Sequence, residues 1–280
     1  MNKVLITGAN GFIGKSFISF LNHKNFEIIP VTRKEGDVTD IDFWNSLPSS
    51  DYVIHLAGQN FVPDSWINSN RFLETNVLGT NLALDYCKRN RIPLIYVSAY
   101  LYGIPKELPI TENHPIQPNN PYALSKYLAE QVCKFRADYF DQDVTVLRIF
   151  NVYGPGQRSE FLIPLIVEQF KKKSEIRILD KSPRRDFIYI DDVVESIYSA
   201  MIHCKGYSVY NVGSGLSYSV EEVINLCQEI LNSNYPIHSE GKERLNEIPD
   251  VIADISKIKK ELGWAPKISM REGLRILLNS

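Results

Sequence analysis

Two residues of the segment Pro121-Tyr-Ala-Leu-Ser-Lys126 have side chains that can exchange a proton. Tyr122 and Lys126 are four residues apart, so in a helix they project from the same face. A phenol, with an ordinary pKa of about 10, is a poor base near neutral pH. A neighbouring lysine ammonium favours the phenolate and so lowers the pKa of the phenol. Tyr122 is therefore a candidate acid/base whose pKa Lys126 would lower. The alternative is an aromatic ring beside a solvated lysine.

A glycine-rich segment near the N-terminus has the spacing of a phosphate-binding loop. Gly8, Gly11 and Gly14 lie between an apolar run at 3–7 and a segment with helical spacing at 11–21. The first glycine permits a tight turn, the second lets backbone approach a pyrophosphate, and the third lets helix and strand pack closely. A helix N-terminus there adds free N–H groups. The loop predicts dinucleotide binding, and a turn that merely requires glycine is the alternative. The other loop residues expected to contact the dinucleotide are Asn10, Phe12 and Ile13.

The end of the second expected strand usually contacts the adenosine ribose. An acidic residue there would accept a hydrogen bond from a free 2′-hydroxyl and repel a 2′-phosphate. This chain has Arg33 and Lys34 at that point. Two cations favour a 2′-phosphate, so NADP(H) is expected over NAD(H). NAD(H) stays open, because both side chains can instead be solvated while the adenosine end is bound elsewhere.

The elements that must position these residues alternate between strand and helix. Near-continuous apolar runs indicate strands, and apolar residues at helical spacing lie between them. This alternation predicts an α/β fold, a Rossmann-type doubly wound parallel sheet covered on both faces. Pro30 is an awkward residue for a central strand. The expected strands are 3–7, 26–32, 52–56, 94–98 and 144–149, and the expected helices are 11–21, 74–88 and 121–139.

After Tyr153 the alternation is interrupted, and a second, smaller mixed α/β lobe is expected. Helical patterns cover 159–173, 191–204, 219–232 and 256–262, with short strands at 176–179 and 208–212. The C-terminal half is expected to cross back to the sheet at least once. The division predicted is a dinucleotide-binding domain of 1–163 with 186–218, and a substrate-binding lobe of 164–185 with 219–280.

Composition excludes several classes of function. Of the 280 residues 44% are hydrophobic and 23% charged, and the formal charge is −2, so a nucleic-acid or anionic-membrane surface is not indicated. No apolar run approaches the ~20 residues of a membrane span, and the N-terminus lacks the layout of a signal peptide. The four cysteines are scattered without metal-ligand spacing. They indicate reduced thiols in a cytoplasmic protein without a metal site.

Several further motifs occur in one order along nearly the whole chain, and together they resemble the extended short-chain dehydrogenase/reductase family, in its nucleotide-sugar epimerase/dehydratase group. Each motif is weak alone, but the combination is specific. The motifs are the glycine loop, Asp37 in Gly-Asp-Val-Thr-Asp, His55-Leu-Ala-Gly58, Asn76 in Thr-Asn-Val-Leu-Gly-Thr, Ser98 in Val-Ser-Ala-Tyr-Leu-Tyr-Gly, Tyr122-Ala-Leu-Ser-Lys126, Leu147-Arg-Ile-Phe-Asn151-Val-Tyr-Gly-Pro155, Arg185-Asp-Phe-Ile-Tyr-Ile-Asp-Asp192, Arg244 with Glu247, Ala253-Asp254 and Leu262-Gly-Trp264.

The resemblance implies a role for each matching residue. Tyr122 would be the acid/base, Lys126 would lower its pKa and bind the nicotinamide ribose, and Ser98 would orient the substrate oxygen. The further cofactor contacts implied are Asp37, Val38, Leu56, Ala57, Gly58 and Asn76, and the substrate contacts implied are Ser98, Ala99, Tyr100, Asn151, Arg185 and Arg244.

Some of these residues can also have a purely structural role. Asp37 can be ordinary turn chemistry, and Asn76 can be purely structural. A surface salt bridge is the alternative for Arg185 and for Arg244. His55 lies in an apolar strand and is expected to be a satisfied core histidine.

Three chemistries of the family must be separated. A 4,6-dehydratase would carry an acid pair after the serine, where this chain has Ala99 and Tyr100. A 4-epimerase would hold NAD permanently, whereas a 4-keto reductase uses an exchangeable cofactor, often NADPH. Arg33 and Lys34 favour the reductase, and the run from His55 to Trp66 resembles a bacterial subgroup linked to reduction of nucleotide-linked 4-keto-6-deoxy sugars.

The alternatives are the epimerase and a non-catalytic NAD(P)-binding sensor, although sensors tend to lose the tyrosine or the lysine. The nucleotide and the sugar are not specified by the sequence. A homodimer through the helices at 74–90 and 121–140 is expected by resemblance.

Overall fold

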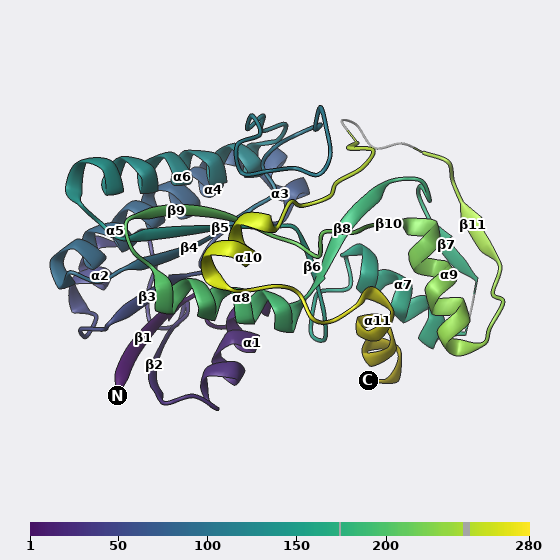
Figure 1. Cartoon of the computed structure of the whole chain (residues 1–280), viewed down its shortest axis with the longest axis horizontal. Helices are drawn as coiled ribbons and strands as arrows, with labels where there is room; N and C mark the ends of the chain where they lie inside the picture. The colour runs from purple at the N-terminus through teal and green to yellow at the C-terminus, as the bar shows by residue number, and fades with distance from the viewer. Residues whose placement is uncertain (174, 243–246) are drawn as a thin grey trace.

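The computed structural model describes residues 1–173, 175–242 and 247–280. Its larger part is a parallel sheet with helices on both faces (Figure 1). Within the described residues this sheet has six strands in the order β2-β1-β3-β4-β5-β9. The chain leaves β2 on one side of β1 and enters β3 on the other, so the strand order reverses beside β1, where dinucleotide sites form in such sheets. The strands are β1 (Asn2–Thr7), β2 (Phe26–Val31), β3 (Tyr52–His55), β4 (Leu94–Ala99), β5 (Val144–Ile149) and β9 (Tyr207–Val212).

Apolar side chains explain why these segments form the sheet. Val4, Leu5 and Ile6 of β1 are fully buried, as expected for a central parallel strand with helices on both faces. Pro30 lies in β2, which pairs only with β1 among the described strands. Proline is tolerated there because one side of an edge strand makes no ladder bonds. The doubly wound α/β fold predicted from the sequence is confirmed.

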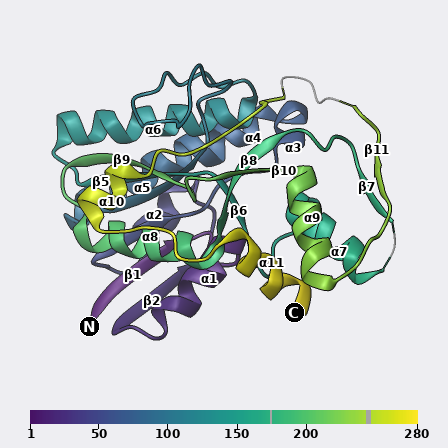
Figure 2. The same ribbon diagram turned by 45° about the vertical axis from the view of Figure 1, so that its right-hand side comes forward.

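Two pairs of helices cover the faces of the sheet. Helices α5 and α6 lie on one face, and α1 and α8 lie on the other (Figures 1 and 2). A π-helical turn, η1, runs directly into α5, so the expected helix at 74–88 begins with an irregular turn. The elements of this part are α1 (Phe12–Leu21), α2 (Ile41–Ser46), α3 (Val62–Ile67), α4 (Ser69–Leu73), η1 (Glu74–Leu78), α5 (Gly79–Asn90), α6 (Pro121–Phe140) and α8 (Ile190–His203).

The second lobe is built around small sheets in the orders β10-β8-β6 and β11-β7 (Figure 2). As expected, the chain leaves it and returns to the main sheet, where α8 packs on one face and β9 forms a strand. The elements of this lobe and its connections are β6 (Asn151–Tyr153), α7 (Leu162–Lys171), β7 (Ile176–Ile178), β8 (Arg184–Tyr189), β10 (Ser217–Ser219), α9 (Val220–Leu231), β11 (Ile237–Ser239), α10 (Ser256–Leu262) and α11 (Met270–Asn279).

One hydrophobic core runs through both parts of the molecule. It joins Ile6 and Leu147 of the main sheet to Ile224 and Leu274 of the second lobe. A separate core, which includes Leu84 and Ala129, lies between the sheet and helices α5 and α6. The shared core fixes the second lobe against the edge of the sheet where the parallel strands end.

Candidate active site

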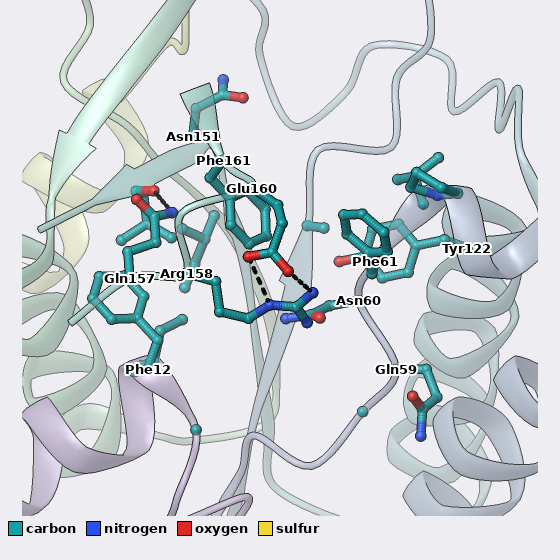
Figure 3. Close-up of a pocket in the computed structure, with 18 of the residues that line it drawn as sticks. Phe12, Gln59, Asn60, Phe61, Tyr122, Asn151, Gln157, Arg158, Glu160 and Phe161 are labelled. Atoms are coloured by element: carbon teal, nitrogen blue, oxygen red, sulfur yellow. Dashed lines mark hydrogen bonds and ion pairs between the residues drawn. The ribbon is translucent and has the colours of Figure 1, made fainter. Parts of the chain in front are cut away.

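A cleft of about 2110 Å³ lies between the carboxyl ends of the parallel strands and the second lobe (Figure 3). Ligand pockets for one small molecule usually span roughly 300–1,000 Å³, so this cleft has room for two large ligands. Nearly all residues predicted to bind cofactor or substrate line it. They are Gly8, Asn10, Gly11, Phe12, Ile13, Gly14, Arg33, Lys34, Asp37, Val38, Leu56, Ala57, Gly58, Ser98, Ala99, Tyr100, Tyr122, Lys126, Asn151 and Arg185.

The glycine loop fits the pyrophosphate of a dinucleotide. Gly8 has φ +67°, and a Cβ on it would lie 2.8 Å from the backbone nitrogen of Ala57. A Cβ on Gly14 would lie 2.4 Å from the carbonyl oxygen of Gly8. Side chains at these positions would fill the space that the loop leaves at the start of α1. The N–H groups of Ala9 and Gly11 donate to the carbonyl oxygens of Val31 and Gly8, so the groups left for an anion are those at the start of α1.

The turn after β2 presents positive charge to the cleft. Arg33 and Lys34 line the cleft, and neither forms an ion pair with any residue that the structure describes. The adjacent acid, Glu35, instead accepts hydrogen bonds from the backbone nitrogen and the hydroxyl of Thr32, at 2.7 and 2.5 Å. These bonds hold the pKa of Glu35 below its usual range. Two residues after Glu35, Asp37 accepts hydrogen bonds from the backbone nitrogen and the hydroxyl of Thr39, the turn chemistry considered as its alternative.

Thr7 fixes the loop after β3. Its Oγ1 accepts hydrogen bonds from the backbone nitrogens of Leu56 at 3.2 Å and Ala57 at 3.1 Å. Its hydroxyl proton therefore goes to Nδ1 of His55, 2.8 Å away. Burial, with a contribution from the charge of Lys126, lowers the pKa of His55 to about 3, so the ring is neutral and carries its proton on Nε2.

His55 was expected to be a satisfied core histidine, and it is satisfied at one nitrogen only. Its Nε2 has no hydrogen-bond partner among residues 1–173, 175–242 and 247–280. The ring packs between Trp44 and Tyr96, with centroid distances of 6.3 and 6.1 Å. His55 does not line the cleft formed by the described residues, which agrees with a role in holding the loop and not in catalysis.

Asn76 lies behind the cleft wall and does not line it in the described part of the chain. Its side chain accepts from the backbone nitrogen of Gln59 at 2.8 Å and donates to the carbonyl oxygen of Gln59 at 3.1 Å. It also donates to Oγ of Ser125 at 2.8 Å. Asn76 thus ties the loop after β3 to helix α6, which supports the structural alternative for this residue.

The acid/base candidates meet on one wall of the cleft. Asn120 caps α6 by accepting from the backbone nitrogen of Ala123 at 2.8 Å, and Pro121 occupies the first turn. The helix then presents Tyr122 and Lys126 to the same cleft as Ser98 at the end of β4. The hydroxyl oxygen of Ser98 is buried and has no partner among the residues described by the structure. A substrate oxygen can therefore take up this free hydrogen-bonding group.

The charge arrangement differs from the sequence-based expectation. The Nζ of Lys126 donates to the carbonyl oxygen of Val97 at 2.7 Å and lies 4.1 Å from the ring centroid of Tyr96. Burial lowers the pKa of Lys126 to about 7. Burial also raises the pKa of Tyr122 to about 12, in the direction opposite to the lowering expected from a neighbouring ammonium. Tyr122 is therefore a protonated phenol at neutral pH.

The predicted substrate residues are partly engaged by the protein itself. The hydroxyl of Tyr100 donates to the carbonyl oxygen of Gly103 at 2.5 Å, and Asn151 donates to the carbonyl oxygen of Asp186 at 3.1 Å. Arg185 forms an ion pair with Glu247 and donates to the carbonyl oxygen of Ile248 at 2.6 Å. Arg185 thus forms a salt bridge, but not the surface one given as its alternative, because both side chains are only 19% exposed and Arg185 lines the cleft. Arg244 lies outside the described residues.

Sequence reasoning missed a group of cleft residues on two loops. The guanidinium of Arg158 lies 5.1 Å from the ring centroid of Phe61 and pairs with Glu160 at 2.9 Å (Figure 3). Gln157 donates to the carbonyl oxygen of Val152 at 2.8 Å. The signal that could have found these residues is position, because both loops follow the carboxyl ends of strands, β3 and β6.

The described residues offer neither a metal site nor a membrane-spanning helix. Among the described residues no three histidine, cysteine, aspartate or glutamate side chains are placed to hold a metal ion. No helix in the same part of the chain is long and apolar enough to cross a bilayer. The four cysteines are free thiols.

A match to a family model decides the relationship. The model of the NAD dependent epimerase/dehydratase family matches residues 4–213. The chain belongs to this family. The glycine loop, the tyrosine–lysine pair and the serine described above all fall inside the matched residues, so the protein is an NAD(P)-dependent enzyme of the extended short-chain dehydrogenase/reductase type.

The individual proteins that this chain resembles are named for several different reactions. The chain is 32% identical to GDP-6-deoxy-D-mannose reductase of Pseudomonas aeruginosa, over 99% of this chain and 96% of that protein. It is 30% identical to a putative UDP-glucose 4-epimerase of Methanocaldococcus jannaschii, over 99% of this chain and 97% of that protein. Among solved structures, RMD from Pseudomonas aeruginosa complexed with NADPH has a TM-score of 0.92 and 30% identity, and covers 100% of this chain and 98% of its own.

Proposed function

We propose that the protein is an NADPH-dependent reductase of a nucleotide-linked 4-keto-6-deoxy sugar. The observation that carries this proposal is the pair of cations Arg33 and Lys34, which line the same cleft as Tyr122 and Ser98 and form no ion pair with a described residue. Reduction of a ketone needs a proton donor at the carbonyl oxygen, whereas oxidation of an alcohol needs a base. A phenol that keeps its proton at neutral pH suits the reductive direction.

The residues of the cleft then have distinct roles. When bound, NADPH supplies the hydride that C4 of the keto sugar accepts. Tyr122 gives its proton to the C4 oxygen as the carbonyl becomes a hydroxyl, and the resulting phenolate is reprotonated from water. The hydroxyl of Ser98 hydrogen-bonds the same oxygen and fixes its position. The ammonium of Lys126 stabilises the phenolate formed during proton transfer and binds the nicotinamide ribose.

The cofactor preference rests on charge. Arg33 and Lys34 are free to contact a 2′-phosphate, whereas Glu35, which would repel it, is turned back onto Thr32. Guanidinium groups match phosphate geometry well. This arrangement supports NADP(H) over NAD(H). The relative complexed with NADPH supports it as well.

The 4-epimerase is the second candidate, favoured by the 30% identity to a putative UDP-glucose 4-epimerase. Dehydration is disfavoured because Ala99 and Tyr100 supply no carboxyl group where that reaction needs an acid. The relative named for a GDP-linked sugar makes a GDP-4-keto-6-deoxy sugar the first substrate to assay.

We further propose that the chain is divided into two domains. Residues 1–163 with 186–218 would bind the dinucleotide, and residues 164–185 with 219–280 would bind the nucleotide sugar.

A homodimer is part of the same proposal. Helix α6 leaves large apolar side chains exposed at Leu124, Leu128 and Phe135, by 45%, 37% and 53%. The spacing of these residues follows one side of the helix. A second copy of the chain would cover this face, and analytical ultracentrifugation of the wild type and a Leu128→Glu variant tests for it.

The experiment that tests the proposed chemistry replaces Tyr122 with phenylalanine. Removing a positioned proton donor typically lowers turnover by about 10²–10⁴-fold, so Tyr122→Phe should lose NADPH oxidation with a keto-sugar substrate and keep NADPH binding. Tyr139→Phe, at an exposed position on the same helix, is the matched control and should behave as the wild type. Normal turnover in Tyr122→Phe would refute the assignment.

A further inference from the structure

A buried ion pair lies one helical turn along α6 from Lys126. Glu130 of α6 and Arg148 of β5 leave only 1% and 6% of their side chains exposed. The Nη2 of Arg148 lies 2.7 Å from one carboxylate oxygen of Glu130, and its Nε lies 3.2 and 3.1 Å from the two oxygens. Neither residue lines the cleft formed by the described residues. Direct contact with a ligand therefore does not explain the pair.

The remaining donors of Arg148 connect the pair to the substrate wall. Its Nη1 donates to the hydroxyl of Tyr102 at 2.8 Å and to the carbonyl oxygen of Glu112 at 3.2 Å. The Tyr102 hydroxyl donates in turn to Asn211 of β9 at 2.6 Å. The ring of Tyr102 packs edge-on against Tyr100, which lines the cleft. Arg148 thus fixes α6, two strands of the sheet and the loop after β4 to one another.

Stability alone is a weak reason for this arrangement. Replacing a buried ion pair by apolar side chains of similar volume is often neutral or stabilising. Here the chain buries a third charge close by, the ammonium of Lys126, which is 6% exposed. Burial favours a neutral amine. An ammonium in this place therefore needs a negative charge nearby, and Glu130 supplies one from position i+4 of the same helix.

Glu130 and Cys133 are the residues whose charges act against burial and raise the pKa of Lys126. The thiol of Cys133 is itself kept protonated, because burial raises its pKa. The carboxyl group of Glu130, held by Arg148, is thus the neighbour that acts against the burial of Lys126. The other titratable groups that face Lys126 or Glu130 are Tyr122 on α6, Tyr96 on β4, His55 on β3, Arg148 on β5, Tyr207 on β9 and Tyr102 in the loop after β4.

We propose that Glu130, held by Arg148, is a positioning residue that favours the ammonium form of Lys126 at the cleft. The inference concerns the charge state of Lys126, and only its consequence for turnover rests on the proposed function. Arg148 acts on Lys126 indirectly, because its hydrogen bonds hold the carboxylate of Glu130 one helical turn from the lysine.

The test reads the titration of Lys126 directly. The full-length protein is labelled with ¹³Cε-lysine, and the Lys126 signal is assigned by its loss in Lys126→Arg. In the wild type the signal should titrate near pH 7. An opposite charge within a few ångströms shifts a pKa by about 1–3 units, so Glu130→Gln should lower the midpoint by about one pH unit or more. The basic limb of the pH profile of turnover should move by the same amount.

Two further variants separate charge from structure. The double variant Glu130→Gln with Arg148→Met lacks both charges of the pair. The midpoint of its Lys126 titration should stay below that of the wild type, even if its free energy of unfolding returns to the wild-type value. Asp85→Asn breaks the ion pair between Arg136 of α6 and Asp85 of α5, far from Lys126 along the helix, and should leave the midpoint unchanged.

An unchanged Lys126 midpoint in the double variant would overturn the proposal, as would an equal shift in Asp85→Asn. Should Glu130→Gln alone unfold, the same outcomes are measured in the double variant. The NMR titration needs no substrate, so a failure of the reductase assignment would not be mistaken for a failure of this inference.

Discussion

Replacing Gly14 by alanine should weaken dinucleotide binding through steric contacts with the backbone of the loop. An added Cβ at this position would lie 2.4 Å from the carbonyl oxygen of Gly8, 2.8 Å from that of Ala9 and 2.9 Å from the Cα of Ala9. All three atoms belong to the backbone of the loop, so no side chain can rotate away. The start of α1 must therefore move away from the end of β1.

The size of the effect follows from the cost of overpacking. Forcing a methyl group into a packed site usually costs about 1–3 kcal/mol. If the loop relaxes only by opening, most of that free energy is lost from dinucleotide binding. Since each 1.4 kcal/mol changes a dissociation constant about tenfold, Gly14→Ala should weaken NADPH binding by roughly 10- to 100-fold.

The assay is a fluorescence titration of NADPH, together with urea unfolding of each variant. Gly206→Ala is the control, because Gly206 (φ +62°) lies outside the cleft formed by the described residues and a Cβ there would meet nothing within 4 Å among the described atoms. It should lose about 1–2 kcal/mol of stability from left-handed backbone strain and bind NADPH normally. Wild-type affinity in Gly14→Ala would refute the close-packed loop.

Three further outcomes are expected. Replacing Arg33 and Lys34 by alanine together should weaken NADPH binding by at least about tenfold while changing NADH binding little, as the loss of a charged hydrogen bond costs about 1.5–3 kcal/mol; equal losses for both cofactors would argue against 2′-phosphate contact. Lys126→Met should abolish turnover yet raise the free energy of unfolding at neutral pH. The folded-state pKa of Lys126, about 7 against 10.5, makes the wild type gain stability as pH rises between those values, and this gain should vanish in the variant. Thr7→Val should lower the free energy of unfolding by about 1–3 kcal/mol, because two backbone donors and His55 lose their partner.

Much of the fold could be predicted from local patterns. The five expected strands and the long helices of the dinucleotide-binding part appear within a few residues of their predicted bounds, because their apolar residues recur at the spacing of a strand or of a helix. Four strands of three residues are too short to show alternation of apolar and polar side chains: β6, β7, β10 and β11. Of these only β7 was predicted from the sequence. Their pairing depends on backbone contacts between segments far apart in the chain.

The site could be predicted in its residue types but not in its charges. Spacing placed Tyr122 and Lys126 on one helical face, and the structure brings both to the cleft. The direction of the Lys126 ammonium depends on the carbonyl of Val97, 29 residues away, so no local pattern reveals it. The half-satisfied state of His55 likewise depends on Thr7, 48 residues away. Electrostatics at the site is a property of long-range packing.

The measurement that tests the central claim most directly is the transfer of deuterium from NADPH. The purified protein is incubated with C4-deuterated NADPH, each face labelled in turn, and with a GDP-4-keto-6-deoxy sugar, followed by the dTDP and UDP analogues. We expect one label to appear at C4 of the product sugar, with one NADP⁺ formed for each sugar reduced. A protein that carries stoichiometric NAD as purified, and interconverts C4 epimers with no net consumption of cofactor, would contradict the reductase assignment and establish the epimerase.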